Sequence, residues 1–216
     1  MILCLAVLAA PKHLDEAREL LKAVSAPNNR YQHRPSVVTW GENAVCNTDC
    51  SGLGVALLQK AYPWATPDWF KATFAKLKPL AKDFYVAIKR GSAFEPIDKV
   101  SDLQPGDWIA IQYEKEADNT GHLMLVNGPV EKIQAAEPQI PDLDQYIVPI
   151  LDCTSSPHGP KDTRRGTKTG GIGTGEFRLY AKPDGTLNGY AWSISSKTKF
   201  YAPGTRDLIV GRLTTQ

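Results

Sequence analysis

The sequence predicts an α+β fold in which N-terminal helices pack on a mainly antiparallel β-sheet. Three observations support this class: helical spacing of apolar residues in the first part of the chain, short alternating runs after it, and turn residues between those runs. Helices that precede a series of strands are typical of α+β proteins. Because 42% of the 216 residues are hydrophobic, the chain can bury one core, and we expect a single domain over residues 11–216.

Helices are expected in the first half of the chain. Each is predicted where apolar residues recur at helical spacing, and proline or turn residues set its end. The expected segments are residues 14–24, 50–62, 67–77 and 80–88. Residues 30–43 are expected to be irregular, and residues 63–100 to form a helical insertion.

Strands are expected in the second half, at residues 108–113, 122–126, 146–152, 176–181, 190–195 and 208–213. Pro149 cannot donate a ladder hydrogen bond, so its strand is predicted to lie at an edge or to carry a bulge. The segment 154–175 is rich in small and basic residues and is predicted to be a mobile loop beside a site. Residues 174–216 are interpreted as a C-terminal β extension.

Charge and hydropathy exclude two classes of partner. The formal net charge of +2 is too small to indicate nucleic-acid binding, and no run approaches the roughly 18 apolar residues of a membrane span. Residues 1–10 are apolar and end in small residues, like the later part of a secretory signal, so we expect export to the periplasm or the extracellular space. They lack a charged leader, and a cytoplasmic protein with a hydrophobic N-terminal segment stays open. The sequence indicates no oligomeric state.

Cys50 is the first candidate for chemistry. Asp49 and Ser51 favour a helix start, so Cys50 would lie in the first helical turn. There, free backbone N–H groups and the helix dipole favour a thiolate, which is the nucleophilic form. Cys46 lies in the preceding loop and is predicted to be structural, although it could pair with Cys153 in an exported protein.

His122 and Asp152 supply the partners that a cysteine nucleophile needs. His122 begins an apolar strand, and its imidazole can act as a general base near neutral pH. Asp152 ends the next long apolar strand, where its carboxylate could fix the imidazole tautomer. We therefore expect Cys50, His122 and Asp152 to form the catalytic triad of a cysteine hydrolase. His158 is a rival base, disfavoured because a flexible loop would position it poorly.

Four motifs in this order resemble those of the NlpC/P60 cysteine peptidases, which have a papain-like fold. They are Trp40-Gly41, Asp49-Cys50-Ser51-Gly52, Pro105-Gly106-Asp107 and Gly121-His122-Leu123. The resemblance covers about residues 31–155 and implies that Cys50 is the nucleophile, His122 the base and Asp152 the third polar residue, a position commonly held by His in the family. It also implies a hydrolase that cleaves amide bonds in the stem peptides of bacterial peptidoglycan.

Further site residues are weaker predictions. Arg164 and Arg165 could bind substrate carboxylates, and Asn47 could join the Cys50 N–H in an oxyanion hole. The other expected substrate contacts are Trp40, Asp49 and Ser51. The chemistry needs no cofactor, and no Cys-x-x-Cys pair supports a zinc site. Two alternatives stay open: an amidase or acyltransferase on another small amide, and a papain-like scaffold that binds peptidoglycan fragments or a partner without turnover.

Overall fold

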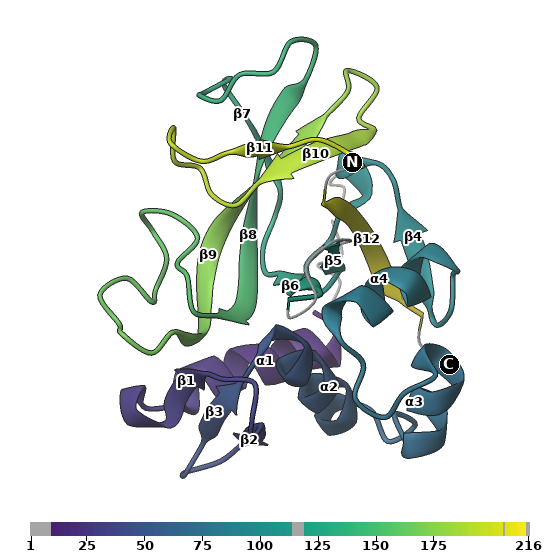
Figure 1. Cartoon of the computed structure of the whole chain (residues 1–216), viewed down its shortest axis with the longest axis vertical. Helices are drawn as coiled ribbons and strands as arrows, with labels where there is room; N and C mark the ends of the chain where they lie inside the picture. The colour runs from purple at the N-terminus through teal and green to yellow at the C-terminus, as the bar shows by residue number, and fades with distance from the viewer. Residues whose placement is uncertain (1–9, 114–118, 205, 215–216) are drawn as a thin grey trace, which may run out of the picture.

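The computed structural model describes residues 10–113, 119–204 and 206–214 (Figure 1). It confirms the α+β class, because helices pack on a large sheet whose neighbouring strands run antiparallel. The expected signal-like segment lies almost entirely outside the described residues. Within the described part of the chain, no helix has the length and apolar character that a membrane crossing requires.

The four predicted helices are present, as α1 (Lys12–Ala23), α2 (Cys50–Ala61), α3 (Pro67–Phe74) and α4 (Ala81–Lys89). The third ends three residues earlier than its apolar spacing predicts. Ala75 adopts the left-handed conformation with φ 56°, which closes the helix while its N–H still bonds the carbonyl of Lys71. The start of α3 is fixed by Thr66, whose hydroxyl accepts the N–H of Trp69 at 3.3 Å.

A small sheet replaces the irregular segment expected before Cys50. Its strands are β1 (Asn29–Tyr31), β2 (Val37–Thr39) and β3 (Val45–Thr48), in the order β1-β3-β2. Strands of three or four residues are too short to show an alternating period, so the sequence did not predict them. The central strand β3 is followed after one residue by α2, so the small sheet positions the start of the helix that carries Cys50.

The large sheet has the order β11-β10-β9-β8-β6-β5-β12-β4, with β7 paired beside β6 on β8. Its strands are β4 (Phe94–Ile97), β5 (Trp108–Gln112), β6 (Gly121–Val126), β7 (Glu131–Ile133), β8 (Asp144–Thr154), β9 (Gly171–Ala181), β10 (Leu187–Ala191), β11 (Phe200–Tyr201) and β12 (Asp207–Leu213). Strand β12 lies between β5 and β4 and completes that part of the sheet, whereas β9, β10 and β11 extend the sheet beyond β8.

Pro149 corrects one expectation about this sheet. Its strand β8 is an interior strand, with β9 on one side and both β6 and β7 on the other. Pairing with β7 ends at Ile147 and pairing with β6 begins at Ile150, so the proline falls between the two partners. Its carbonyl accepts the N–H of Asn127 on that same side, where the missing proline N–H breaks no ladder.

The sheet separates two hydrophobic cores. Leu123, Leu125 and Leu151 pack with α1, α2 and α4, whereas Met124 and Ile150 pack in a second core with residues such as Phe177. Every residue of β6 is buried, which explains its continuous apolar run. Figure 1 shows α1, α2 and the small sheet gathered at one end of β8 and β9. The candidate residues lie at this end.

Candidate functional site

Cys50 is the first residue of α2, as the sequence predicts. The carboxylate of Asp49 caps the helix by accepting the N–H of Gly52 at 2.7 Å and the hydroxyl of Ser51 at 3.0 Å. Gly52 is required here, because a Cβ atom would come within 2.2 Å of the Thr48 hydroxyl. Asp49 and Ser51 are therefore used first to build the turn that presents Cys50.

The sulfur of Cys50 lies against the beginning of β6. It lies beside Leu123 and Ser51, and the side chain is nearly buried. Burial raises the pKa of Cys50 to about 12, and the negative charge of Asp49 adds to this effect. The expected stabilisation of a thiolate by the helix start is outweighed, so Cys50 is a neutral thiol at neutral pH.

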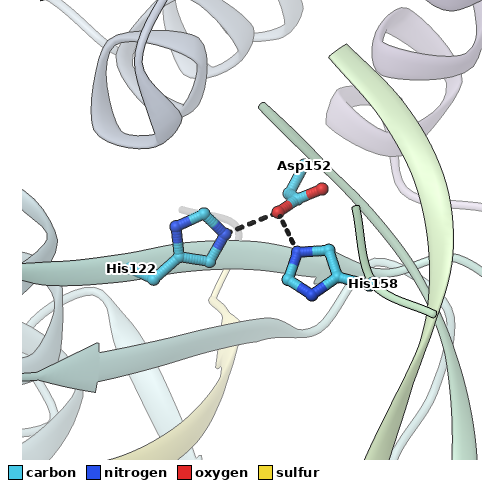
Figure 2. Close-up of side chains that lie close together, drawn as sticks. All are labelled: His122, Asp152 and His158. Atoms are coloured by element: carbon cyan, nitrogen blue, oxygen red, sulfur yellow. Dashed lines mark hydrogen bonds and ion pairs between the residues drawn. The ribbon is translucent and has the colours of Figure 1, made fainter. Parts of the chain in front are cut away.

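The structure brings His122 and Asp152 together, as predicted. His122 Nε2 lies 2.5 Å from Asp152 Oδ2, and both side chains are buried (Figure 2). The carboxylate is an acceptor, so Nε2 carries the proton, and the other ring nitrogen points away from Asp152. Burial lowers the pKa of His122, an effect that the bond to Asp152 only partly offsets, and the charges of His158 and Arg164 lower it further.

His158 is a member of the same cluster, which corrects the expectation that a flexible loop would place it poorly. Its Nε2 lies 2.9 Å from Asp152 Oδ2, and its Nδ1 lies 3.0 Å from the carbonyl oxygen of Trp192. Its backbone N–H donates to Asp162 at 2.7 Å. The side chain is only 4% exposed. The segment 154–175 is therefore fixed to the sheet at this point.

Arg164 also fixes this loop, and its placement differs from the predicted role of binding substrate carboxylates. Its guanidinium donates to Asp152 Oδ1 at 2.6 Å and to Asp162 at 2.7 and 2.9 Å. The side chain is enclosed and its charge is neutralised by these two carboxylates of the chain itself. Arg164 is therefore an internal ion-pair residue and not a substrate contact. Arg165 is exposed, and its role as a substrate contact stays a prediction.

Metal binding is the other chemistry that this cluster suggests. One ligand-type atom each from His122, Asp152 and His158 lies within 4.8 Å of the others. Both histidines, however, already direct Nε2 at Asp152, whose second oxygen is bound to the Arg164 cation. A metal ion would have to break these bonds and share the carboxylate with a guanidinium, so the geometry suits a proton network better.

Two connected hollows approach Cys50 from the helix side. A cavity of about 60 Å³ is lined by Cys50, Tyr31 and the strand-start residue Gly121, among others. A larger cleft of about 560 Å³ extends from it along α2. The two share the lining residues His33, Asp49, Ser51 and Leu80. Asp49 and Ser51 thus lie at the junction between cleft and thiol, and their role as substrate contacts stays a prediction.

Trp40 and Asn47 are placed differently from these residues. The Trp40 indole N–H donates to the carbonyl of Glu16 on α1 at 3.0 Å, and its ring lies against Lys60, so it ties β2 to the helices. It does not line the cleft or the cavity. Asn47 lies on β3 with a buried Oδ1 that has no partner among the described residues. Its oxyanion role stays a prediction.

The cysteines within the described residues are free. Cys46, Cys50 and Cys153 are buried thiols, and no disulfide joins Cys46 to Cys153 in this structure. The thiol of Cys153 donates to the carbonyl of Thr48 at 3.1 Å, and the Cys46 thiol is its hydrogen-bonding neighbour. This contact joins β8 to β3, consistent with the structural role predicted for Cys46.

Sequence reasoning missed the loop half of the cluster. The signal that could have found it is the pattern His158, Asp162, Arg164 within seven residues of a segment otherwise rich in small residues. Glycines at positions 173 and 175 are a second signal, because Cβ atoms there would collide with Arg164 and with His158 and Asp162.

Comparison with known proteins finds one significant relative among curated sequences. The chain is similar to "Uncharacterized protein R653" of Acanthamoeba polyphaga mimivirus, with 36% identity over 225 aligned positions that cover 94% of this chain and 96% of that protein. No protein-family model matches the chain. No solved structure shows a significant match to it. The relative is named as uncharacterized, so any conclusion about activity must come from the site.

Proposed function

This chain belongs to the same family as the mimivirus protein, and from its site we propose that it is a cysteine hydrolase of papain-like type that cleaves amide or peptide bonds. One observation carries the proposal: Cys50 packs against Leu123, the residue directly after His122, and Asp152 lines the same small pocket. A thiol at a helix start and an imidazole held by a carboxylate thus share one short stretch of β6. This is the set of groups that acyl transfer requires.

The proposed reaction uses the nitrogen of His122 that Asp152 leaves open. As Cys50 Sγ bonds the amide carbon, its proton moves to His122 Nδ1, and Asp152 holds the resulting imidazolium through Nε2. The imidazolium then gives that proton to the departing amine as the C–N bond breaks, which leaves a thioester on Cys50. Water attacks the thioester with His122 again as base, and the acid product and free thiol are released.

Sulfur and imidazole approach β6 from its two sides. Cys50 belongs to the helix-side core, whereas Met124, which shares the His122 face of the strand, belongs to the other core. Catalysis therefore requires the two groups to meet at the start of β6, at Gly121, which lines the cavity beside Cys50. Apo geometry of catalytic pairs is often loose and tightens when substrate binds.

The cleft supports a substrate in the form of an extended chain. Its wall combines apolar residues such as Val55 with the cationic side chains of Arg34 and Lys78, and its carboxylate, Asp49, is occupied by the helix cap. Such a wall favours an acidic peptide over a basic one. Stem peptides of peptidoglycan, the substrate class implied by the family resemblance, carry free carboxylates and fit this description.

Replacement of Cys50 tests the proposal. We expect Cys50→Ala to abolish release of amines from a peptidoglycan digest or a peptide panel followed by mass spectrometry. Cys46→Ala is the matched control, because Cys46 is another buried free thiol four residues away that lines neither hollow. Hydrolysis that survives in Cys50→Ala would disprove the assignment. A trapped acyl adduct that transfers to added amines faster than to water would instead indicate the acyltransferase.

The burial of Cys50 favours a second candidate, a scaffold that binds such peptides without turnover. A thiol with a pKa near 12 is a poor nucleophile unless a base acts with it. The rate of alkylation by iodoacetamide separates the two functions. If a base assists Cys50, the thiol reacts faster than its pKa alone allows, and the rate falls in His122→Ala. If the thiol is only buried, it reacts equally slowly in the unchanged protein and in His122→Ala.

A further inference from the structure

We propose that His158 is a positioning residue that stays positively charged and thereby keeps His122 neutral in the resting site. The inference rests on the proposed function and adds a residue to it. His158 touches neither Cys50 nor the hollows that lead to it, and it acts through Asp152. The consequence is a resting pair of neutral thiol and neutral imidazole, in which charge separates only during attack on the substrate.

The hydrogen bonds of His158 define its charge. Nδ1 faces the carbonyl oxygen of Trp192, which can only accept, and Nε2 faces the carboxylate of Asp152, which accepts when ionised. Both ring nitrogens must therefore donate, and an imidazole with two N–H groups is a cation. His13 offers the contrast inside the same protein: its Nε2 faces the Gly106 carbonyl, but its Nδ1 faces the Tyr62 hydroxyl, which can donate to it.

The surroundings of His122 show why a second imidazolium is unfavourable there. Asp152 Oδ2 already receives His158, and Oδ1 receives the Arg164 guanidinium, so one carboxylate faces two cations. Asp162 balances part of that charge, but it bonds Arg164 and the His158 backbone and not His122. Among the described residues, the Trp192 ring borders His122 on the loop side, with 5.6 Å between the ring centroids, and it carries no charge.

This charge arrangement has a use in catalysis. The proton that His122 accepts from Cys50 produces a cation beside His158 and Arg164, which repel it. The imidazolium is consequently a stronger acid and gives its proton more readily to the departing amine. His158 thus favours the acid step, in which the C–N bond breaks. It disfavours a thiolate–imidazolium pair in the resting site.

Nuclear magnetic resonance of protein with ¹⁵N-labelled histidine tests the charge states without any variant. Near neutral pH we expect both nitrogens of His158 to be protonated, and His122 to carry a proton on Nε2 alone. A neutral His158 at neutral pH would overturn the proposal. This readout does not depend on turnover, so it can fail while hydrolysis by Cys50 is upheld, and the reverse also holds.

Substitution of His158 tests the effect on His122. In His158→Gln the cation is lost, and we expect the acid limb of the pH profile, for hydrolysis or for Cys50 alkylation, to move upward by about one pH unit. His158→Lys restores the charge and should return the limb toward its original position. Lys182→Gln is the control, because it removes one exposed positive charge away from the site. A folded His158→Gln protein with an unmoved acid limb would refute the positioning role, and if this variant does not fold the labelled-histidine measurement decides.

Discussion

Arg164 and Arg178 are both buried, so the charge of each needs partners inside the protein, and these partners differ in kind. Arg164 is bound by the carboxylates of Asp152 and Asp162. Arg178 is fully buried, and its partners among the described residues are uncharged, including the carbonyl oxygens of Glu137 at 2.8 Å and Ile194 at 2.5 Å. A buried cation can thus be held by ions or by backbone dipoles. Because Arg164 binds the carboxylate of Asp152, it is coupled to the protonation of the candidate site. Arg178 binds carbonyl oxygens and is not coupled to it.

Loss of the ionic arginine should cause the larger effect. Arg164→Met leaves Asp152 and Asp162 buried without their cation, so we expect the free energy of unfolding to fall by about 3–5 kcal/mol. Urea denaturation at neutral pH measures it, with the exposed neighbour Arg165→Met as the matched control. A loss no larger than that of the control would show that His158 alone can neutralise Asp152.

Loss of the dipole-bound arginine should cost less. Arg178→Met removes donors from carbonyl groups of residues 136, 137 and 194 but strands no carboxylate, so we expect a loss of about 1–3 kcal/mol. The acid limb of the proposed hydrolysis should stay in place. A shifted limb in Arg178→Met would mean that this arginine is coupled to the site after all, and the contrast with Arg164 would fail.

The smallest effect concerns acid stability. The Arg164 and His158 cations hold the pKa of Asp152 well below its usual range, and the bonds from Arg164 lower that of Asp162. A carboxyl group with a lowered folded-state pKa stabilises the fold above its unfolded value, near 3.9, and this contribution is lost as the pH falls through the folded value. Arg164→Met should therefore flatten the acid decline by on the order of 1 kcal/mol, while Arg178→Met keeps the original slope. Denaturation curves recorded at decreasing pH distinguish the two.

The sequence predicted what depends on local period and local capping. The four helices follow from apolar spacing, and the position of Cys50 at a helix start follows from Asp49. The pairing of His122 with Asp152 was predicted because both were expected at strand ends, although β8 continues to Thr154. The charge of His158 and the burial of Arg164 were missed because they depend on a loop that folds back over β8 and β9, and no local pattern reports such a contact.

The pKa of Cys50 shows the same division between local and distant effects. Its helix-start position is local, and it was predicted. The burial that outweighs the helix dipole comes from β6 and β8, which lie 70 and more residues further along the chain. Electrostatic predictions for a buried group therefore need the tertiary structure, even where the motif around it is recognised.

The placement of β12 between β5 and β4 has a consequence for synthesis of the protein. Strand β12, residues 207–213, pairs with residues 94–97 on one side and with residues 108–112 on the other. Both of these strands therefore keep an unpaired edge until the ribosome has synthesised and released β12. The sheet that carries His122 and Asp152 is therefore assembled late, from distant parts of the chain, which is a slow and aggregation-prone step. A nascent chain that stalls before β12 would expose two strand edges to its neighbours on the same messenger RNA.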